Sequence, residues 1–138
     1  MHNPLIWPLF AMATLTSLVW LRLFFTRIGE MKRRDIHPQL VAKSIQTSQL
    51  EDTRAADNFR NLFELPVLFY VAILLAIHAN LQNLTLLILA WAFVVLRILH
   101  SYIHCTYNRV MDRFKVYLFG GIVLWAFWGV LAYLLIFK

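Results

Sequence analysis

The chain has 138 residues, of which 61% are hydrophobic and 14% are charged, and its mean hydropathy is +0.65. Soluble domains are about 45–50% apolar and about 25% charged, so the composition indicates a membrane protein and the length a single domain, residues 1–138. The formal net charge of +6 does not indicate nucleic acid, because the basic residues flank apolar runs and form no basic face with interleaved aromatic residues.

The first apolar run predicts a membrane helix over about residues 4–28. Its uncharged part, from Pro4 to Leu21, is long enough to cross the hydrocarbon core of a bilayer. No lysine or arginine precedes it and no small-residue cleavage site stands out, so we expect a membrane span rather than a cleaved signal peptide. Arg22 and Arg27 continue this helix towards water.

The second helix is expected over about residues 49–80, after a long polar connection. Ser48 and Glu51 form a capping-box pattern that indicates its start. At about 1.5 Å per residue the helix is longer than a bilayer core of about 30 Å, so its first turns should project from the membrane. Pro66 lies inside it and should kink it or break one backbone hydrogen bond.

The third and fourth helices are expected over about residues 84–107 and 113–137, joined by a short basic loop. All thirteen lysine and arginine residues except Lys138 lie in or beside the first and third connections. By the positive-inside rule these two connections are cytoplasmic and both termini lie on the other side. The sequence therefore predicts an all-α fold, an antiparallel four-helix bundle in the membrane.

Three polar sets are expected at the cytoplasmic end of this bundle. The stretch RILHSYIH at the end of the third helix has its polar residues at i, i+3, i+4 and i+7, on one helical face. Ionisable groups in a membrane are costly unless they face partners or water. The antiparallel topology brings together the following residues of helices two, three and four: Asp57, Asn61 and Glu64; Arg97, His100, Ser101 and His104; Arg113 and Tyr117.

Residue spacing alone leaves three interpretations of these polar sets open. Glu64 could form a structural ion pair with Arg97 or Arg113, or the arginines could form an anion site that faces the cytoplasm. His100 and His104, at i and i+4, could hold a metal ion with Glu64 as third ligand. No HExxH motif or second carboxylate supports the metal site, so we predict no metal ligands.

The combination of NLFE in the second helix, RILHSYIH in the third and R-x-x-x-Y opening the fourth resembles the MAPEG family, the membrane-associated proteins in eicosanoid and glutathione metabolism. The resemblance covers nearly the whole chain from about Ser48, and identifies it as a divergent, bacterial-type member, expected in the inner membrane. It implies a four-helix protein that forms homotrimers and binds glutathione between neighbouring subunits near the cytosolic face.

The resemblance also implies roles for individual residues, carried over by their places in the motifs. Asn61 and Glu64 hold the amino end of glutathione, and Arg113 stabilises its thiolate, with Tyr117 and His100 as assisting groups. A helix-one arginine, either Arg22 or Arg27, is also expected at the site. The resemblance implies further glutathione-binding positions at Arg60, Arg97, Ser101 and His104.

Four positions depart from the family pattern, and one of them is Pro66, which falls earlier in the second helix than is usual. Asp57 stands where many members have an arginine, and it would repel a ligand carboxylate. His104 and Phe114 stand where the prostaglandin-forming branch has a tyrosine and a serine. These departures argue against eicosanoid chemistry.

The expected function is that of a glutathione-dependent transferase or peroxidase acting on lipophilic electrophiles at the cytoplasmic membrane face. The apolar substrate would arrive through the bilayer. The alternative is a non-catalytic scaffold, or a protein that binds anionic lipid head groups, with the same fold. A proton-coupled exporter also fits the size, but Glu64 is its only candidate carboxylate and lies near one surface among arginines.

Overall fold

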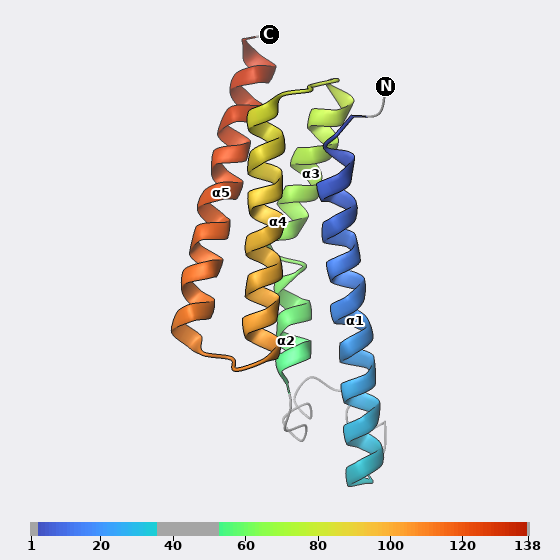
Figure 1. The fold of residues 1–138 in the computed structure, drawn as a ribbon. Helices are drawn as coiled ribbons and strands as arrows, with labels where there is room; N and C mark the ends of the chain where they lie inside the picture. Colours follow the sequence, from blue (N-terminus) through green and yellow to red (C-terminus); the bar gives the residue numbers. More distant parts are fainter. Residues whose placement is uncertain (1–2, 36–52, 138) are drawn as a thin grey trace.

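The structure is a computed structural model that describes residues 3–35 and 53–137. Within these residues, four helical spans are long and apolar enough to cross a membrane, and they run antiparallel side by side (Figure 1). The predicted four-helix membrane bundle is thereby confirmed. The spans are α1 (Ile6–Arg34), α2 with α3 (Arg54–Asn61 and Leu65–His78), α4 (Leu84–Cys105) and α5 (Val110–Ile136). The predicted capping box at Ser48 and Glu51 lies outside the described residues.

The first span is longer than the sequence predicted. α1 continues to Arg34 rather than ending near residue 28, and it projects beyond the turn that joins α4 and α5 (Figure 1). Its last turn is basic, with Lys32, Arg33 and Arg34, and cations at this position interact favourably with the helix dipole. The helix ends at Asp35, whose φ of 51° is left-handed.

The second span is divided into α2 and α3 by a break just before Pro66. In the interior of a helix the proline ring would clash with the carbonyl group four residues earlier, whereas in a first turn its missing N–H has no consequence. Pro66 accordingly lies in the first turn of α3, and Glu64, with φ −96° and ψ −102°, leaves the helical conformation. The break allows Glu64 to point sideways from the bundle axis towards α5.

The two short turns of the bundle each contain an asparagine with positive φ. Asn80, with φ 52°, lies between α3 and α4, and Asn108, with φ 47°, lies between α4 and α5. Asparagine tolerates this left-handed conformation better than most residues. The second turn is shorter than expected, so α5 begins at Val110 and Arg113 lies within its first turn.

The interior of the bundle is apolar, and so is most of its outer surface. Phe69 of α3 stacks on Phe93 of α4, with ring centroids 4.6 Å apart, and Phe127 of α5 lies 6.3 Å from Phe69. Many large apolar side chains point outwards, among them Trp7 and Phe119. Such a surface would be unstable in water, and lipid chains cover it in a membrane.

Candidate functional site

The polar stripe of α4 faces the interior of the bundle. The exposed fractions of its four side chains are between 1% and 4%, for Arg97, His100, Ser101 and His104. Ionisable side chains this deeply buried need polar partners or a polar cavity. The stripe thus points towards α2 and α5, which carry the other polar sets.

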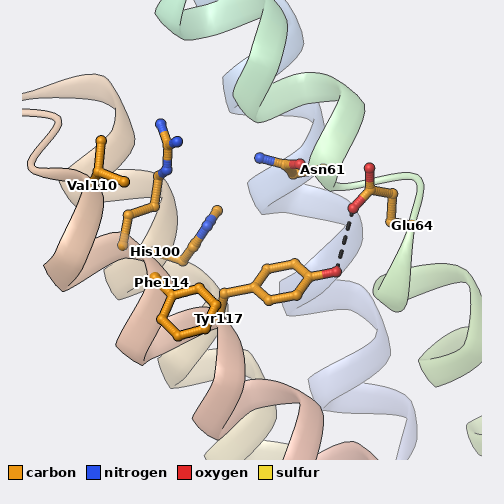
Figure 2. Close-up of a pocket in the computed structure, with 7 residues that line it drawn as sticks. Asn61, Glu64, His100, Val110, Phe114 and Tyr117 are labelled. Carbon is orange, nitrogen blue, oxygen red and sulfur yellow. Dashed lines mark hydrogen bonds between the residues drawn. The ribbon is translucent and has the colours of Figure 1, made fainter.

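A pocket of about 220 Å³ opens between α2, α4 and α5, towards the end of the bundle that carries the α4–α5 turn (Figure 2). It brings together five of the residues that the sequence singled out: Asn61, Glu64, His100, Arg113 and Tyr117. Val110 and Phe114 complete its lining. The pocket therefore combines a carboxylate, a guanidinium, an imidazole, a phenol and an amide in one small volume.

The carboxylate of Glu64 faces the phenol of Tyr117 across the pocket (Figure 2). Tyr117 Oη donates a hydrogen bond of 3.4 Å to Glu64 Oε2. This contact is long and joins two partly accessible side chains, so the carboxylate keeps lone pairs free for another donor. Glu64 reaches Tyr117 because the break between α2 and α3 turns it out of the helix.

Arg113 is held at the pocket by two acceptors from the end of α4 and the following turn. Its Nη1 donates to Asn108 Oδ1 at 2.8 Å and lies 3.3 Å from His104 Nε2. An amide oxygen and an imidazole nitrogen carry no negative charge. The guanidinium is thus oriented by groups that do not neutralise it.

Arg97 does not line the pocket, and its guanidinium lies over the ring of Tyr117. Its guanidinium carbon is 5.2 Å from the ring centroid of Phe93 and 5.0 Å from that of Tyr117, so the cation is stacked between two aromatic faces. Gly120 of α5 packs close to it, because a Cβ atom there would be in ordinary van der Waals contact with Arg97 Nη2, at 3.5 Å. Among the described residues, neither Nη1 nor Nη2 of Arg97 has a hydrogen-bond partner.

Ser101 faces α2 rather than the pocket. Its hydroxyl donates to Asn58 Oδ1 at 3.3 Å, and Asn58 Nδ2 donates to Cys105 Sγ at 3.5 Å. Asn58 is fully buried, so these bonds satisfy an amide that would otherwise be costly in an apolar interior. The resulting polar link joins α2 to the end of α4.

The helix-one arginines and Arg60 lie outside the pocket lining. Arg22 Nη2 donates to the carbonyl oxygen of Cys105 at 2.6 Å, and so fixes α1 to the end of α4. Arg27 has a buried Nε without a hydrogen-bond partner in the described part of the chain. Arg60 is exposed on α2.

The described residues offer no cluster of side chains for the metal site considered from the sequence. In residues 3–35 and 53–137, no group of three or more histidine, cysteine, aspartate and glutamate side chains could hold a metal ion. His100 and His104 are near one another, with ring centroids 5.8 Å apart. His104 Nε2 faces Arg113, so a cation at that nitrogen would have a guanidinium as its neighbour.

Two asparagines of this region were not singled out from the sequence, namely Asn58 and Asn108. Asn58 precedes Asn61 by one helical turn, and an amide in a helix that faces an apolar core is a signal that it has a polar partner. Asn108 carries a weaker signal, because asparagine is common in turns for its backbone conformation alone. Only the structure places its side chain on Arg113.

The bundle and its pocket define an integral membrane protein with a mixed acidic and basic site at one end of four antiparallel spans. The chain belongs to the MAPEG family, whose family model matches residues 5–133, nearly the whole chain. Comparisons with curated proteins and with solved structures found no match.

Proposed function

We propose that this protein is a glutathione-dependent transferase or peroxidase that acts on lipophilic electrophiles at the cytoplasmic face of the membrane. The observation that carries the proposal is a single pocket in which the carboxylate of Glu64 and the un-neutralised guanidinium of Arg113 face the same space. The family to which the chain belongs adds support, because glutathione use is part of the chemistry after which it is named.

The residues of the pocket fit the chemistry of glutathione. Glu64 offers a carboxylate to the ligand's ammonium group, and the amide of Asn61 can bond either a donor or an acceptor. Arg113 would favour the thiolate over the thiol, because a nearby cation stabilises the charged form. Glutathione, when bound, supplies the nucleophilic sulfur, and His100 or Tyr117 would assist by hydrogen bonding.

An apolar groove beside the pocket supports a lipophilic second substrate. The groove has a volume of about 290 Å³ and shares Phe114 and Tyr117 with the pocket. Its other lining residues come from α3 and α5: Leu65, Leu118, Gly121, Ile122 and Trp125. A hydrophobic molecule in the bilayer could therefore approach the sulfur position without crossing water.

The proposed homotrimer rests on the resemblance to the family, and the size of the pocket is compatible with a site shared between copies. Small-molecule sites usually enclose about 300–1,000 Å³, whereas one chain provides an open pocket of about 220 Å³. A neighbouring copy would complete the enclosure of a tripeptide. Native mass spectrometry in detergent is expected to show trimers, and a stable monomer or dimer would contradict this part of the proposal.

The proposed orientation places the pocket on the cytoplasmic side. The pocket is at the end of the bundle that carries the α4–α5 turn and the basic end of α1 (Figure 1), and positive charge favours the cytoplasm. A reporter that is active only outside the cytoplasm, fused after Lys138, is expected to be active. The same reporter inserted after Arg109 is expected to be inactive, and the reverse pattern would refute the orientation.

Filling the groove should impair the reaction with the lipophilic substrate while glutathione still binds. A Cβ atom on Gly121 would lie 3.8 Å from Leu65 Cδ1, so leucine at this position would occupy the space between α3 and α5. We expect Gly121→Leu to raise KM for a lipophilic electrophile about tenfold, the effect of roughly 1.4 kcal/mol. The measurement is steady-state kinetics at saturating glutathione.

The matched control for the groove is Gly129→Leu on the same helix. Nothing lies within 4 Å of a Cβ atom at Gly129, and this position lies one helical turn beyond Trp125, outside the groove lining. Its KM should remain within about twofold of the parent value. Equal effects of the two substitutions would show that the groove does not hold the substrate.

Calorimetry on the purified protein in detergent tests the proposed function directly. Glutathione is expected to bind saturably, and to bind more tightly than its analogue in which a methyl group replaces the thiol, because Arg113 favours the thiolate. Failure of the parent protein to bind glutathione would refute the proposal. Binding to vesicles with anionic head groups in that case would support the lipid-binding alternative.

A further inference from the structure

The turn between α4 and α5 has a backbone that requires no particular side chain at Asn108. The N–H of Asn108 donates to the carbonyl oxygen of Ile103 at 2.9 Å, and its φ is 47°. Glycine is the residue that adopts this left-handed conformation most readily. Asn80, at the opposite end of the bundle, has the same conformation and donates its N–H to Ile77 at 3.0 Å.

The side chain of Asn108, by contrast, has a specific partner. Its Oδ1 accepts the 2.8 Å hydrogen bond from Arg113 Nη1, a distance typical of a hydrogen bond from a cation. The same nitrogen lies 3.3 Å from Nε2 of His104, whose side chain is 99% buried and so fixed in position. Nε2 can accept this bond only in the neutral tautomer that carries its proton on Nδ1.

This arrangement restricts a side chain that otherwise moves freely. An arginine side chain has many rotamers, and each interaction with a ligand must overcome the entropy of ordering them. Two acceptors on one nitrogen order the guanidinium before a ligand arrives. Because both acceptors are neutral, they do this without cancelling the positive charge, as an aspartate at the same distance would.

We propose that Asn108 is a positioning residue, which together with His104 orients the Arg113 guanidinium for stabilising a bound thiolate. This inference rests on the proposed glutathione function, and it adds a residue that acts on the thiolate only through Arg113. The side chain of Asn108 is absent from the pocket lining, whereas Arg113 is part of it. An effect of Asn108 on the thiol would therefore pass through the guanidinium.

The test compares two equivalent substitutions, Asn108→Gly and Asn80→Gly. Both keep the left-handed turn, and only the first removes an acceptor from Arg113. At saturating glutathione, the thiolate absorbance in the ultraviolet is titrated against pH. We expect Asn108→Gly to lower the thiolate fraction about three- to tenfold at a fixed pH below the midpoint, a shift of roughly half to one pH unit. Asn80→Gly should leave the titration unchanged.

A third variant, Asn108→Asp, separates orientation from charge. Aspartate also tolerates the turn and keeps an acceptor for Arg113, but it adds a negative charge beside the guanidinium. Nuclear relaxation of the Arg113 Nε–H group should show an ordered side chain in the parent and in Asn108→Asp, and a mobile one in Asn108→Gly. The thiolate fraction should nevertheless fall in Asn108→Asp, because its carboxylate offsets the cation.

The two readouts distinguish failure of the inference from failure of the function. If the parent binds glutathione and Asn108→Gly titrates like the parent, Asn108 has no positioning role. If the parent does not bind glutathione, the proposed function fails and the positioning role in that function fails with it. In that case the relaxation measurement still shows whether Asn108 orders Arg113. Equal mobility of the Arg113 side chain in the parent and in Asn108→Gly would show that Asn108 does not order it.

Discussion

Replacement of Arg113 by leucine is expected to raise the pKa of the thiol of bound glutathione by about one to two units. The guanidinium faces the pocket and is not neutralised by the groups that hold it, Asn108 and His104. A cation near a thiol stabilises its charged form, and one pKa unit corresponds to about 1.4 kcal/mol. Removing the cation should thus move the titration midpoint of the bound thiol to higher pH.

Glu64→Gln should behave differently from Arg113→Leu. Glu64 would hold the ammonium group of the ligand, an interaction that is present before and after the thiol ionises. Its loss is expected to weaken glutathione binding about tenfold or more, in line with roughly 1.5–3 kcal/mol for a hydrogen bond to a charged group. The midpoint of the thiol titration should change little, because the ammonium contact of Glu64 is lost equally from the complexes with the thiol and with the thiolate. Only the repulsion between the Glu64 carboxylate and the thiolate differs between the two.

The measurement is ultraviolet absorbance of the thiolate against pH, with glutathione at concentrations that saturate each variant. Arg109→Leu is the matched control, because Arg109 lies four residues before Arg113 but is exposed and outside the pocket lining. It removes one positive charge, and its midpoint should lie close to the parent value because exposed charges are screened. An unchanged midpoint in Arg113→Leu with binding intact would remove Arg113 from the catalytic role.

The spans of the bundle were predictable because their signals are strong and local. Long apolar runs with few charges indicate membrane helices, and the structure has four such spans in the described residues. The burial of the α4 stripe also followed from the sequence, because Arg97, His100 and His104 have no low-energy place on a lipid-facing surface.

The details of the site were less predictable because they depend on contacts between helices. Pro66 indicated a disturbance in the second helix, but a proline can produce either a kink or a complete break. The observed break turns Glu64 towards Tyr117, and helical periodicity does not predict that direction. Similarly, spacing places Arg97 and His100 on one face, but only packing shows that Arg97 lies over the ring of Tyr117 and outside the pocket lining.

Replacement of Phe69 by alanine is expected to lower the free energy of unfolding by about 2–4 kcal/mol, the largest effect on stability predicted here for a single substitution. Phe69 is completely buried in α3, stacks on Phe93 of α4 at 4.6 Å with an interplanar angle of 24°, and lies near Phe127 of α5. One side chain thus contributes to the packing of three helices. In a membrane the apolar surface gains little by leaving lipid, so packing contacts and the cavity left behind account for most of the loss.

Phe119→Ala is the matched control for this prediction. Phe119 lies on α5 with 57% of its side chain exposed, and lipid would fill the space left by its ring. Its free energy of unfolding should change by about 0.5 kcal/mol or less. Unfolding of each variant by sodium dodecyl sulfate in mixed micelles, followed by circular dichroism, gives the comparison. Similar losses for Phe69→Ala and Phe119→Ala would contradict a packed aromatic core between α3, α4 and α5.

The aromatic core also supports the candidate site, so Phe69→Ala should reduce activity as well as stability. The ring of Phe93 packs against both Phe69 and the Arg97 guanidinium. The Arg97 guanidinium also lies over the ring of Tyr117. A cavity at Phe69 would let Phe93 shift and loosen the position of Tyr117 at the pocket. We expect a lower kcat in Phe69→Ala even at temperatures where the variant remains folded, whereas Phe119→Ala should retain the parent kcat.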